Sequence, residues 1–382
     1  MPGSSRVALF TGMRLVTNGS FRFLYPFLPV VARDVGLTTA RSGLLLSALA
    51  LGGVLAPPMR RALTGGHEQD RKLLVRAGSI LAVGALVASI APVAAVAVLG
   101  FLLLGIGKPL SDIGAISYVS GRVPAQRLAR ATSTMELTWA GGLIVVAPIA
   151  GAIAGVTSWR VPMAVLGLIV AAIIGVAAVR MDPDPTIDSG TQADRAPLGR
   201  SAAVFLAVVF LVFSALEVSF AAFGVWLEDA YGASIGQLGG FAALTATGEL
   251  VGSGAVLLFG DRLGKARVLA IGLVITAVGA ILLPFATSAM TAAGALGVSV
   301  LGSETAIVAA IPLAATVIPH ARSRFFARMV AMGSLARLLM AGLAPAIYTT
   351  FGIVGNATVS VTVAVLAMVF LRWLLHTDPT LS

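Results

Sequence analysis

Twelve apolar runs follow one another along the chain, and one polar stretch, Met181–Gly199, divides them six and six. A hydrophobic helix needs about 20 residues to span a bilayer, whereas a transmembrane β-strand needs only about ten and alternates in polarity. These runs are long and apolar all round. We therefore predict an all-α polytopic membrane protein, with twelve transmembrane helices near residues 8–31, 42–59, 74–92, 94–119, 131–154, 161–180, 201–227, 235–259, 267–287, 291–317, 328–350 and 354–375.

The polar stretch also predicts the domain boundaries. It contains four Asp residues and follows the sixth apolar run. We expect an N-terminal six-helix bundle at 1–180, a cytoplasmic linker at 181–199 and a C-terminal six-helix bundle at 200–382.

The basic charge of the chain is explained by membrane topology. Hydrophobic residues make up 58% of the sequence and charged residues 11%, whereas a soluble domain has about 25% charged residues. The net charge of +10 could indicate nucleic-acid binding. However, of the 26 Lys and Arg residues, 19 fall on the side of the two termini and only Arg33, Arg41 and Arg160 fall on the other. This asymmetry predicts that both termini are cytoplasmic and that the chain has no nucleic-acid partner.

The sequence offers little for catalysis or metal binding. It has no cysteine, and His67, His320 and His376 lie in three separate segments. It has no Walker lysine loop, no HExxH and no GxSxG motif. We therefore expect neither an enzyme nor a cofactor or metal.

Nine ionisable residues lie inside the apolar runs, where each costs roughly 2.5–3.5 kcal/mol at the centre of a helix. They must pair, protonate or face a water-filled cavity. Eight of them are candidates for a proton and substrate cavity: Arg22, Lys108, Asp112, Glu136, Glu217, Glu249, Glu304 and Arg337. The ninth is Arg14.

Spacing and depth suggest partners for several of these charges. Lys108 and Asp112 are four residues apart, so they share a helix face and predict an intrahelical pair. Glu304 and Arg337 both lie near mid-depth and could pair. Glu249 has no cation at its depth and could carry a proton, or it could stay neutral and bond to the backbone. Glu136 either joins the site or anchors the basic loop before it.

A short charged motif follows the eighth run, where Gly260–Arg267 reads GDRLGKAR. We expect the helix to end at Gly260 and a compact turn to follow. The motif resembles the signature loop of the major facilitator superfamily, and its first-half counterpart, Gly53–Arg61, has Pro57 in place of the aspartate. The resemblance implies a gating loop, and the alternative is a solvated turn with topogenic charges. The residues concerned are Gly260, Asp261, Arg262, Gly264 and Lys265.

A second resemblance lies in the fifth run, where Ala147–Ala152 reads APIAGA. It is similar to a motif of the same superfamily that is linked to antiporters. Pro148 would bend the helix and Gly151 would let it pivot against a neighbour. An ordinary kinked helix is the alternative. The segments 25–29 and 136–141 look like those of bacterial drug or metabolite exporters.

The resemblance implies a secondary transporter that works by alternating access. In the superfamily, the first and seventh spans face each other, so Arg22 and Glu217 would attract across a central cavity. We expect proton-coupled efflux (antiport) of an amphiphilic or drug-like compound. Uptake or uniport of a small metabolite is the alternative, and a transport-inactive membrane sensor or scaffold is a second one. The expected partners are a small-molecule substrate, protons and membrane lipid, and the expected state is a monomer.

Overall fold

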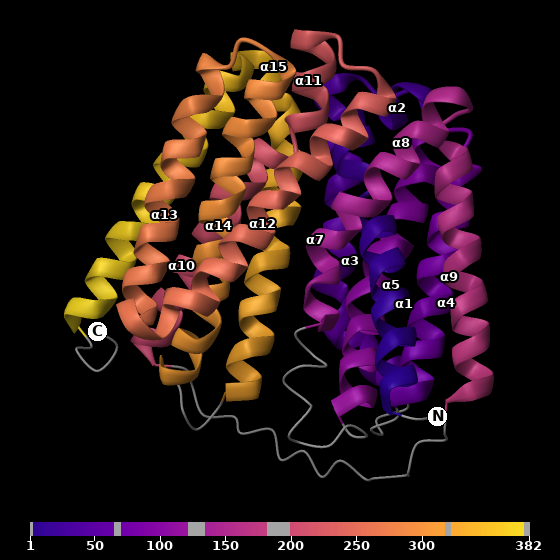
Figure 1. The fold of residues 1–382 in the computed structure, drawn as a ribbon, viewed down its shortest axis with the longest axis horizontal. Coiled ribbons are helices and arrows are strands. Elements are labelled where there is room, and N and C mark those ends of the chain that lie inside the picture. Colours follow the sequence, from indigo (N-terminus) through magenta and orange to yellow (C-terminus); the bar gives the residue numbers. More distant parts are fainter. Residues whose placement is uncertain (1–2, 65–69, 121–133, 182–198, 318–321, 378–382) are drawn as a thin grey trace. The chain divides into compact units, whose positions relative to one another are not determined.

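A computed structural model describes residues 3–64, 70–120, 134–181, 199–317 and 322–377 (Figure 1). These residues are helical almost throughout, and no strand occurs among them. The prediction of an all-α chain is therefore confirmed. The linker predicted at 181–199 lies outside the described residues except at its two ends.

The first helices in chain order are α1 (Gly3–Arg22), α2 (Leu24–Asp34), the short 3₁₀ helix η1 (Thr39–Arg41), α3 (Gly43–Thr64), α4 (Asp70–Ser89), α5 (Ala94–Ser120), α7 (Thr138–Gly141), the π-helix η2 (Gly142–Val146), α8 (Ala147–Val156) and α9 (Arg160–Arg180). They are followed by α10 (Arg200–Phe220), α11 (Phe223–Tyr231), α12 (Ile235–Leu263), α13 (Lys265–Leu282), the 3₁₀ helix η3 (Leu283–Phe285), α14 (Ala289–Val317) and α15 (Arg322–Thr377).

The helices form two compact units. The first unit comprises Met1–Thr38, Leu44–Thr191 and Ser234–Gly240, and the second comprises Thr39–Gly43, Gln192–Ala233 and Phe241–Ser382. In the first unit, α4 packs against α5 and α9, and α1 packs against α5, α7, η2 and α9. In the second unit, α10 lies along α15 and α13 lies along α14.

Ten helical segments among the described residues are long and apolar enough to cross a membrane. The last of them, Arg328–Thr377, covers two predicted spans, and Gly352 interrupts its helix with φ 63° and ψ −168°. The first predicted span, 8–31, is not among the ten, and in the structure it is divided into α1 and α2.

Two of the predicted spans are broken near one end. Between α1 and α2 the helix is interrupted at Phe23, and Pro26 follows three residues later. Proline has no N–H and its ring clashes with the carbonyl four residues before it, which here is that of Arg22. The span 201–227 breaks in the same way at Ala221 and Ala222, between α10 and α11, although no proline lies there. Neither interruption was expected from the apolar runs.

Two pairs of neighbouring helices approach so closely that only glycine fits at the contact. A Cβ atom on Gly84 of α4 would lie 2.5 Å from the backbone nitrogen of Leu104 on α5. A Cβ atom on Gly302 of α14 would lie 2.3 Å from the backbone nitrogen of Thr276 on α13. Small residues allow such contacts in lipid, where packing rather than the hydrophobic effect holds helices together. Helices α4 and α5 correspond to the third and fourth predicted spans, and helices α13 and α14 correspond to the ninth and tenth.

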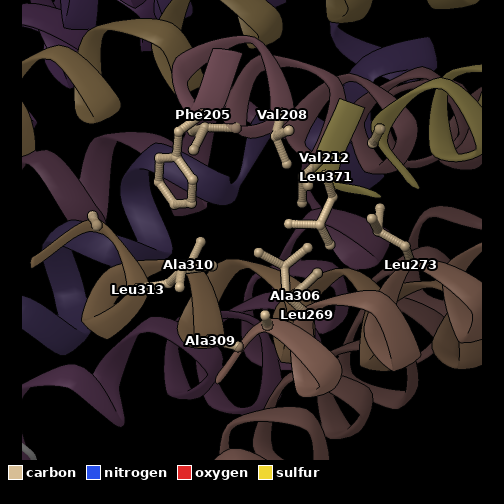
Figure 2. Close-up of a cluster of buried hydrophobic side chains, with 14 of the residues drawn as sticks. Phe205, Val208, Val212, Leu269, Leu273, Ala306, Ala309, Ala310, Leu313 and Leu371 are labelled. Atoms are coloured by element: carbon tan, nitrogen blue, oxygen red, sulfur yellow. The ribbon is translucent and has the colours of Figure 1, made fainter. Parts of the chain in front are cut away.

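The core of the second unit is a cluster of buried side chains from α10, α13, α14 and both ends of α15 (Figure 2). Phe205, Val208 and Val212 come from α10, and Leu269 and Leu273 come from α13. Alanines of α14 fill the space between these larger side chains, which lets the helices pack closely.

Candidate functional site

A cluster of four charged side chains lies in the first unit. Arg14 of α1 places Nη1 2.7 Å from Oε1 of Glu136 and Nε 3.3 Å from Oδ1 of Asp112. On α5, the Lys108 ammonium contacts the other oxygen of Asp112. The Arg14 and Lys108 side chains are 5% and 3% exposed, whereas Glu136 is 61% exposed. Two cations and two carboxylates therefore balance each other, and the more accessible members are the acids.

This cluster contains the predicted Lys108–Asp112 pair and adds Arg14, which the sequence had not placed in the cavity. The sequence could have predicted the contact between Arg14 and Asp112, because both residues lie toward the predicted cytoplasmic end of their spans. Glu136 contacts Arg14. The basic residues that Glu136 was alternatively expected to anchor, Arg122, Arg127 and Arg130, lie outside the described residues.

The aromatic ring of Trp139 connects this cluster to Arg22. The Arg22 guanidinium lies 4.7 Å from the centre of the ring and the Lys108 ammonium lies 5.7 Å from it. Arg22 also donates a hydrogen bond of 3.1 Å to the backbone carbonyl of Trp139. A cation over an indole face is stabilised by the ring quadrupole, more strongly where water is excluded. The cations of α1 and α5 thus share one aromatic partner.

The π-helix η2 is the second unusual feature of this region. Its five residues, Gly142–Val146, separate α7 from α8, and Pro148 follows immediately. Proline at position 148 leaves the carbonyl of Ile144 without its α-helical donor, which favours an irregular turn. The predicted bend at Pro148 is thus accompanied by a π-turn, a feature common at functional sites, while Gly151 lies within regular helix.

The π-helix packs tightly on α1. A Cβ atom on Gly19 would lie 2.6 Å from the side chain of Val146, and one on Gly142 would lie 2.9 Å from the backbone nitrogen of Gly19. One turn away, the buried Asn18 amide donates to the hydroxyl of Thr138 at 3.0 Å. Any change in the π-turn would therefore be transmitted to the helix that carries Arg14 and Arg22.

A second polar site lies in the second unit, between α10 and α15. Nε of Arg337 is 3.7 Å from Oε2 of Glu217, and its guanidinium lies 4.9 Å from the centre of the Phe213 ring. The Glu217 side chain is 3% exposed and that of Arg337 is 24% exposed. The structure places Arg337 beside Glu217, because α10 and α15 lie along each other, and the suggested pairing of Arg337 with Glu304 stays a prediction. Glu304 accepts a hydrogen bond of 2.9 Å from Ser253.

The remaining candidate charges have different outcomes. Glu249 is buried in α12 and takes part in an interaction, and its role as a proton carrier or as a neutral group bonded to the backbone stays a prediction. Arg22 belongs to the first unit and Glu217 to the second. Their attraction therefore stays a prediction. Among the described residues, no group of three or more acidic or histidine side chains could hold a metal ion.

The predicted gating loop is shorter than the sequence suggested. Helix α12 continues through Gly260 and Arg262 to Leu263, so the expected helix end at Gly260 is wrong. Only Gly264 departs from helical geometry, with φ 84° and ψ 140°, and Lys265 begins α13. Gly260 can remain helical because nothing after it breaks the helix, whereas residue 264 needs a backbone that only glycine adopts easily. The contacts of the Asp261 side chain lie outside what the structure describes.

Comparison with known proteins agrees with this architecture. The sequence profile described as Major Facilitator Superfamily matches residues 10–216 and 205–382. A bacterial homolog of the human lysosomal transporter Spinster, in an inward-facing and occupied conformation, is similar in structure. The TM-score is 0.71 at 14% identity, over 99% of this chain and 97% of that chain.

Two further solved structures are similar over almost their whole length. The POT family transporter PepTSo has a TM-score of 0.77 at 12% identity, over 98% of this chain and 99% of that chain. The nucleoside transporter NupG has a TM-score of 0.72 at 14% identity, over 97% of this chain and 100% of that chain. At these identities the likeness concerns the fold. No curated protein sequence matches the chain.

Proposed function

This chain belongs to the major facilitator superfamily of secondary transporters, and from that premise we propose that it exports a small amphiphilic solute in exchange for protons. The chain is a multi-pass membrane protein and, as the sequence predicted, it is not an enzyme. The proposal extends to a bacterial cytoplasmic membrane, cytoplasmic termini and a monomer surrounded by lipid.

The observation that supports proton coupling is the Glu217–Arg337 pair. Its carboxylate is almost fully buried, and its 3.7 Å separation is longer than a close charge-assisted hydrogen bond. A protonated carboxyl group loses its negative charge and becomes a donor, so protonation would release Arg337. An inward proton gains about 2.3 kcal/mol per 100 mV of membrane potential, which can drive solute export.

The first unit supports the same proposal. Asp112 and Glu136 both contact Arg14, so protonation of either acid would change the balance of charge around α1. The π-turn of η2, packed on α1, provides a deformable element next to this charge. The similarity of Pro148 and Gly151 to the antiporter motif favours exchange over uniport. Glu249 and Glu304 are further buried or half-buried carboxylates that could carry protons.

Uptake of a small metabolite is the second candidate function. It is favoured by the fold likeness to PepTSo and to the nucleoside transporter NupG, whose names do not describe drug exporters. The two functions differ in the direction of proton movement relative to solute. A transport-inactive sensor would show neither movement.

The decisive experiment measures proton flux in proteoliposomes that contain a pH-sensitive dye, under an imposed pH gradient, with a panel of amphiphilic anions, cations and neutral solutes. We expect a solute to dissipate the gradient with the wild type, and Glu217→Gln to abolish this response while the protein still inserts. Glu228→Gln, outside both polar sites, is the control. Solute flux without proton movement, or native coupling in Glu217→Gln, would contradict the proposal.

A further inference from the structure

An apolar cavity of about 150 Å³ lies within the second unit, between α10, α14 and α15. Every residue that lines it is apolar, including Val209 and Val212 of α10, Ala310 and Ile311 of α14, and Met329 of α15. Val212 and Ala310 also belong to the buried core in Figure 2. Its volume is close to that of an engineered cavity that binds benzene, so the space suits one aromatic ring or a short alkyl group. Because the lining residues Ile311, Phe326 and Val330 are exposed, the cavity is open to a ligand.

The cavity adjoins the polar site through Phe213. This ring lines the cavity and also lies under the Arg337 guanidinium. Its position is fixed by Gly333, where a Cβ atom would come within 3.0 Å of the ring. Arg337 is two helical turns beyond the cavity residue Val330, about 10 Å along α15.

The polar end of the site presents a cation. In the Glu217–Arg337 pair, the arginine side chain is 24% exposed and the glutamate only 3%. The guanidinium is therefore the more accessible of the two charged groups to a ligand. Guanidinium groups bind carboxylates through strong charge-assisted hydrogen bonds, whereas an amine would be repelled.

We propose that the cavity and Arg337 together form a binding site for a small amphiphilic carboxylate, with its aromatic or alkyl group in the cavity and its anionic head at Arg337. The inference deepens the proposed function, on which it rests for the role of the ligand as substrate. The apolar lining offers no partner for polar groups, so it selects ligands whose polarity is confined to one end. Arg337 and all the residues that line the cavity belong to the second unit.

The test is equilibrium dialysis of radiolabelled 4-phenylbutyrate against the purified full-length protein in phosphatidylcholine nanodiscs. We expect saturable binding, with the neutral amide and 4-phenylbutylamine at least about tenfold weaker because they lack the charge that Arg337 recognises. Arg337→Gln should weaken the binding of 4-phenylbutyrate by a similar factor. Arg337→Lys, which keeps a cation, should weaken it less.

The cavity is tested separately from the charge. Ala310→Leu and Val209→Phe fill it from opposite walls and should both abolish binding, whereas Ala310→Gly leaves it open and should retain binding. Correct folding of each variant is checked by a monodisperse elution profile. Equal binding of the amine or amide, or native binding in both filled variants, would overturn the proposal.

Further measurements separate this inference from the proposed function and from lipid binding. Proton-coupled flux of other solutes by a protein that does not bind 4-phenylbutyrate would overturn the site alone. Binding of 4-phenylbutyrate without any proton flux would support the site and contradict proton coupling. If phosphatidylglycerol in the nanodisc displaces 4-phenylbutyrate completely, the cavity belongs to an anionic lipid and the small-solute assignment is overturned.

Discussion

Arg14 is the residue on which the charged cluster of the first unit depends, since it contacts both Asp112 and Glu136. Its side chain is 5% exposed, so its charge has little water to replace a lost partner. Removing one member of a buried ion pair is usually more damaging than removing both, because the other charge is left without compensation.

We therefore expect Arg14→Gln to lower the free energy of unfolding by about 3 kcal/mol. This value is the lower end of the range for broken buried ion pairs, because Asp112 keeps its ion pair with Lys108. The measurement is SDS-induced unfolding followed by tryptophan fluorescence. Arg14→Lys is the matched control and should lose less. The double variant Arg14→Gln with Glu136→Gln should be more stable than Arg14→Gln alone, because it removes the carboxylate that has lost Arg14 and leaves the Lys108–Asp112 pair intact. Strict additivity of the two changes would argue against their interaction.

The residues also show what the sequence could reveal. Lys108 and Asp112 were predicted as a pair because both lie on one helix, where spacing alone decides contact. The contact between Glu217 and Arg337 was not predicted, because depth along a span does not tell which helices lie side by side. That information comes from packing, which places α10 along α15.

At the scale of the helices, the apolar runs predicted the positions of the helices well but their ends poorly. Pro26 marked the break after α1, yet its run was apolar enough to be taken as continuous. The π-turn at Gly142–Val146 has no apolar signature, since an inserted residue does not change the composition of a span. The end of α12 depended on the backbone conformation of one glycine, Gly264.

This glycine provides a test of the turn between α12 and α13. Gly264 has φ 84° and ψ 140°, and its Cβ position is open, so the effect of an added methyl group comes from the backbone alone. Gly264→Ala should therefore cost about 1–3 kcal/mol of stability. Gly254→Ala, at an equally open position inside α12, should cost nothing. The comparison uses the same SDS titration, and equal stability of the two variants would show that the turn relaxes freely.

At the scale of the whole molecule, composition and charge asymmetry were sufficient to predict a polytopic membrane protein, whereas the transporter fold was implied by the resemblance of the Gly260–Arg267 motif. The domain bounds expected from the polar stretch stay a prediction. The identity of the solute did not follow, because it depends on side chains brought together from separate helices, such as Phe213 and Arg337.

The predicted orientation is testable because the chain has no cysteine. Thr287→Cys, before α14, and Thr377→Cys, at the end of α15, are both exposed positions. A membrane-impermeant maleimide should label Thr287→Cys in intact cells, and Thr377→Cys only after permeabilisation, because the positive-inside asymmetry places the termini in the cytoplasm. The reverse pattern of labelling would invert the topology.

The glycine contacts of α4–α5 and α13–α14 have a consequence for biogenesis. In both pairs the two helices are neighbours in sequence, joined by Ile90–Val93 in the first pair and by residues 283–288 in the second. Contacts between sequence neighbours form quickly, because little chain entropy is lost in closing a short loop. Each pair can therefore form a helical hairpin as it leaves the translocon, and the later spans can then pack against it.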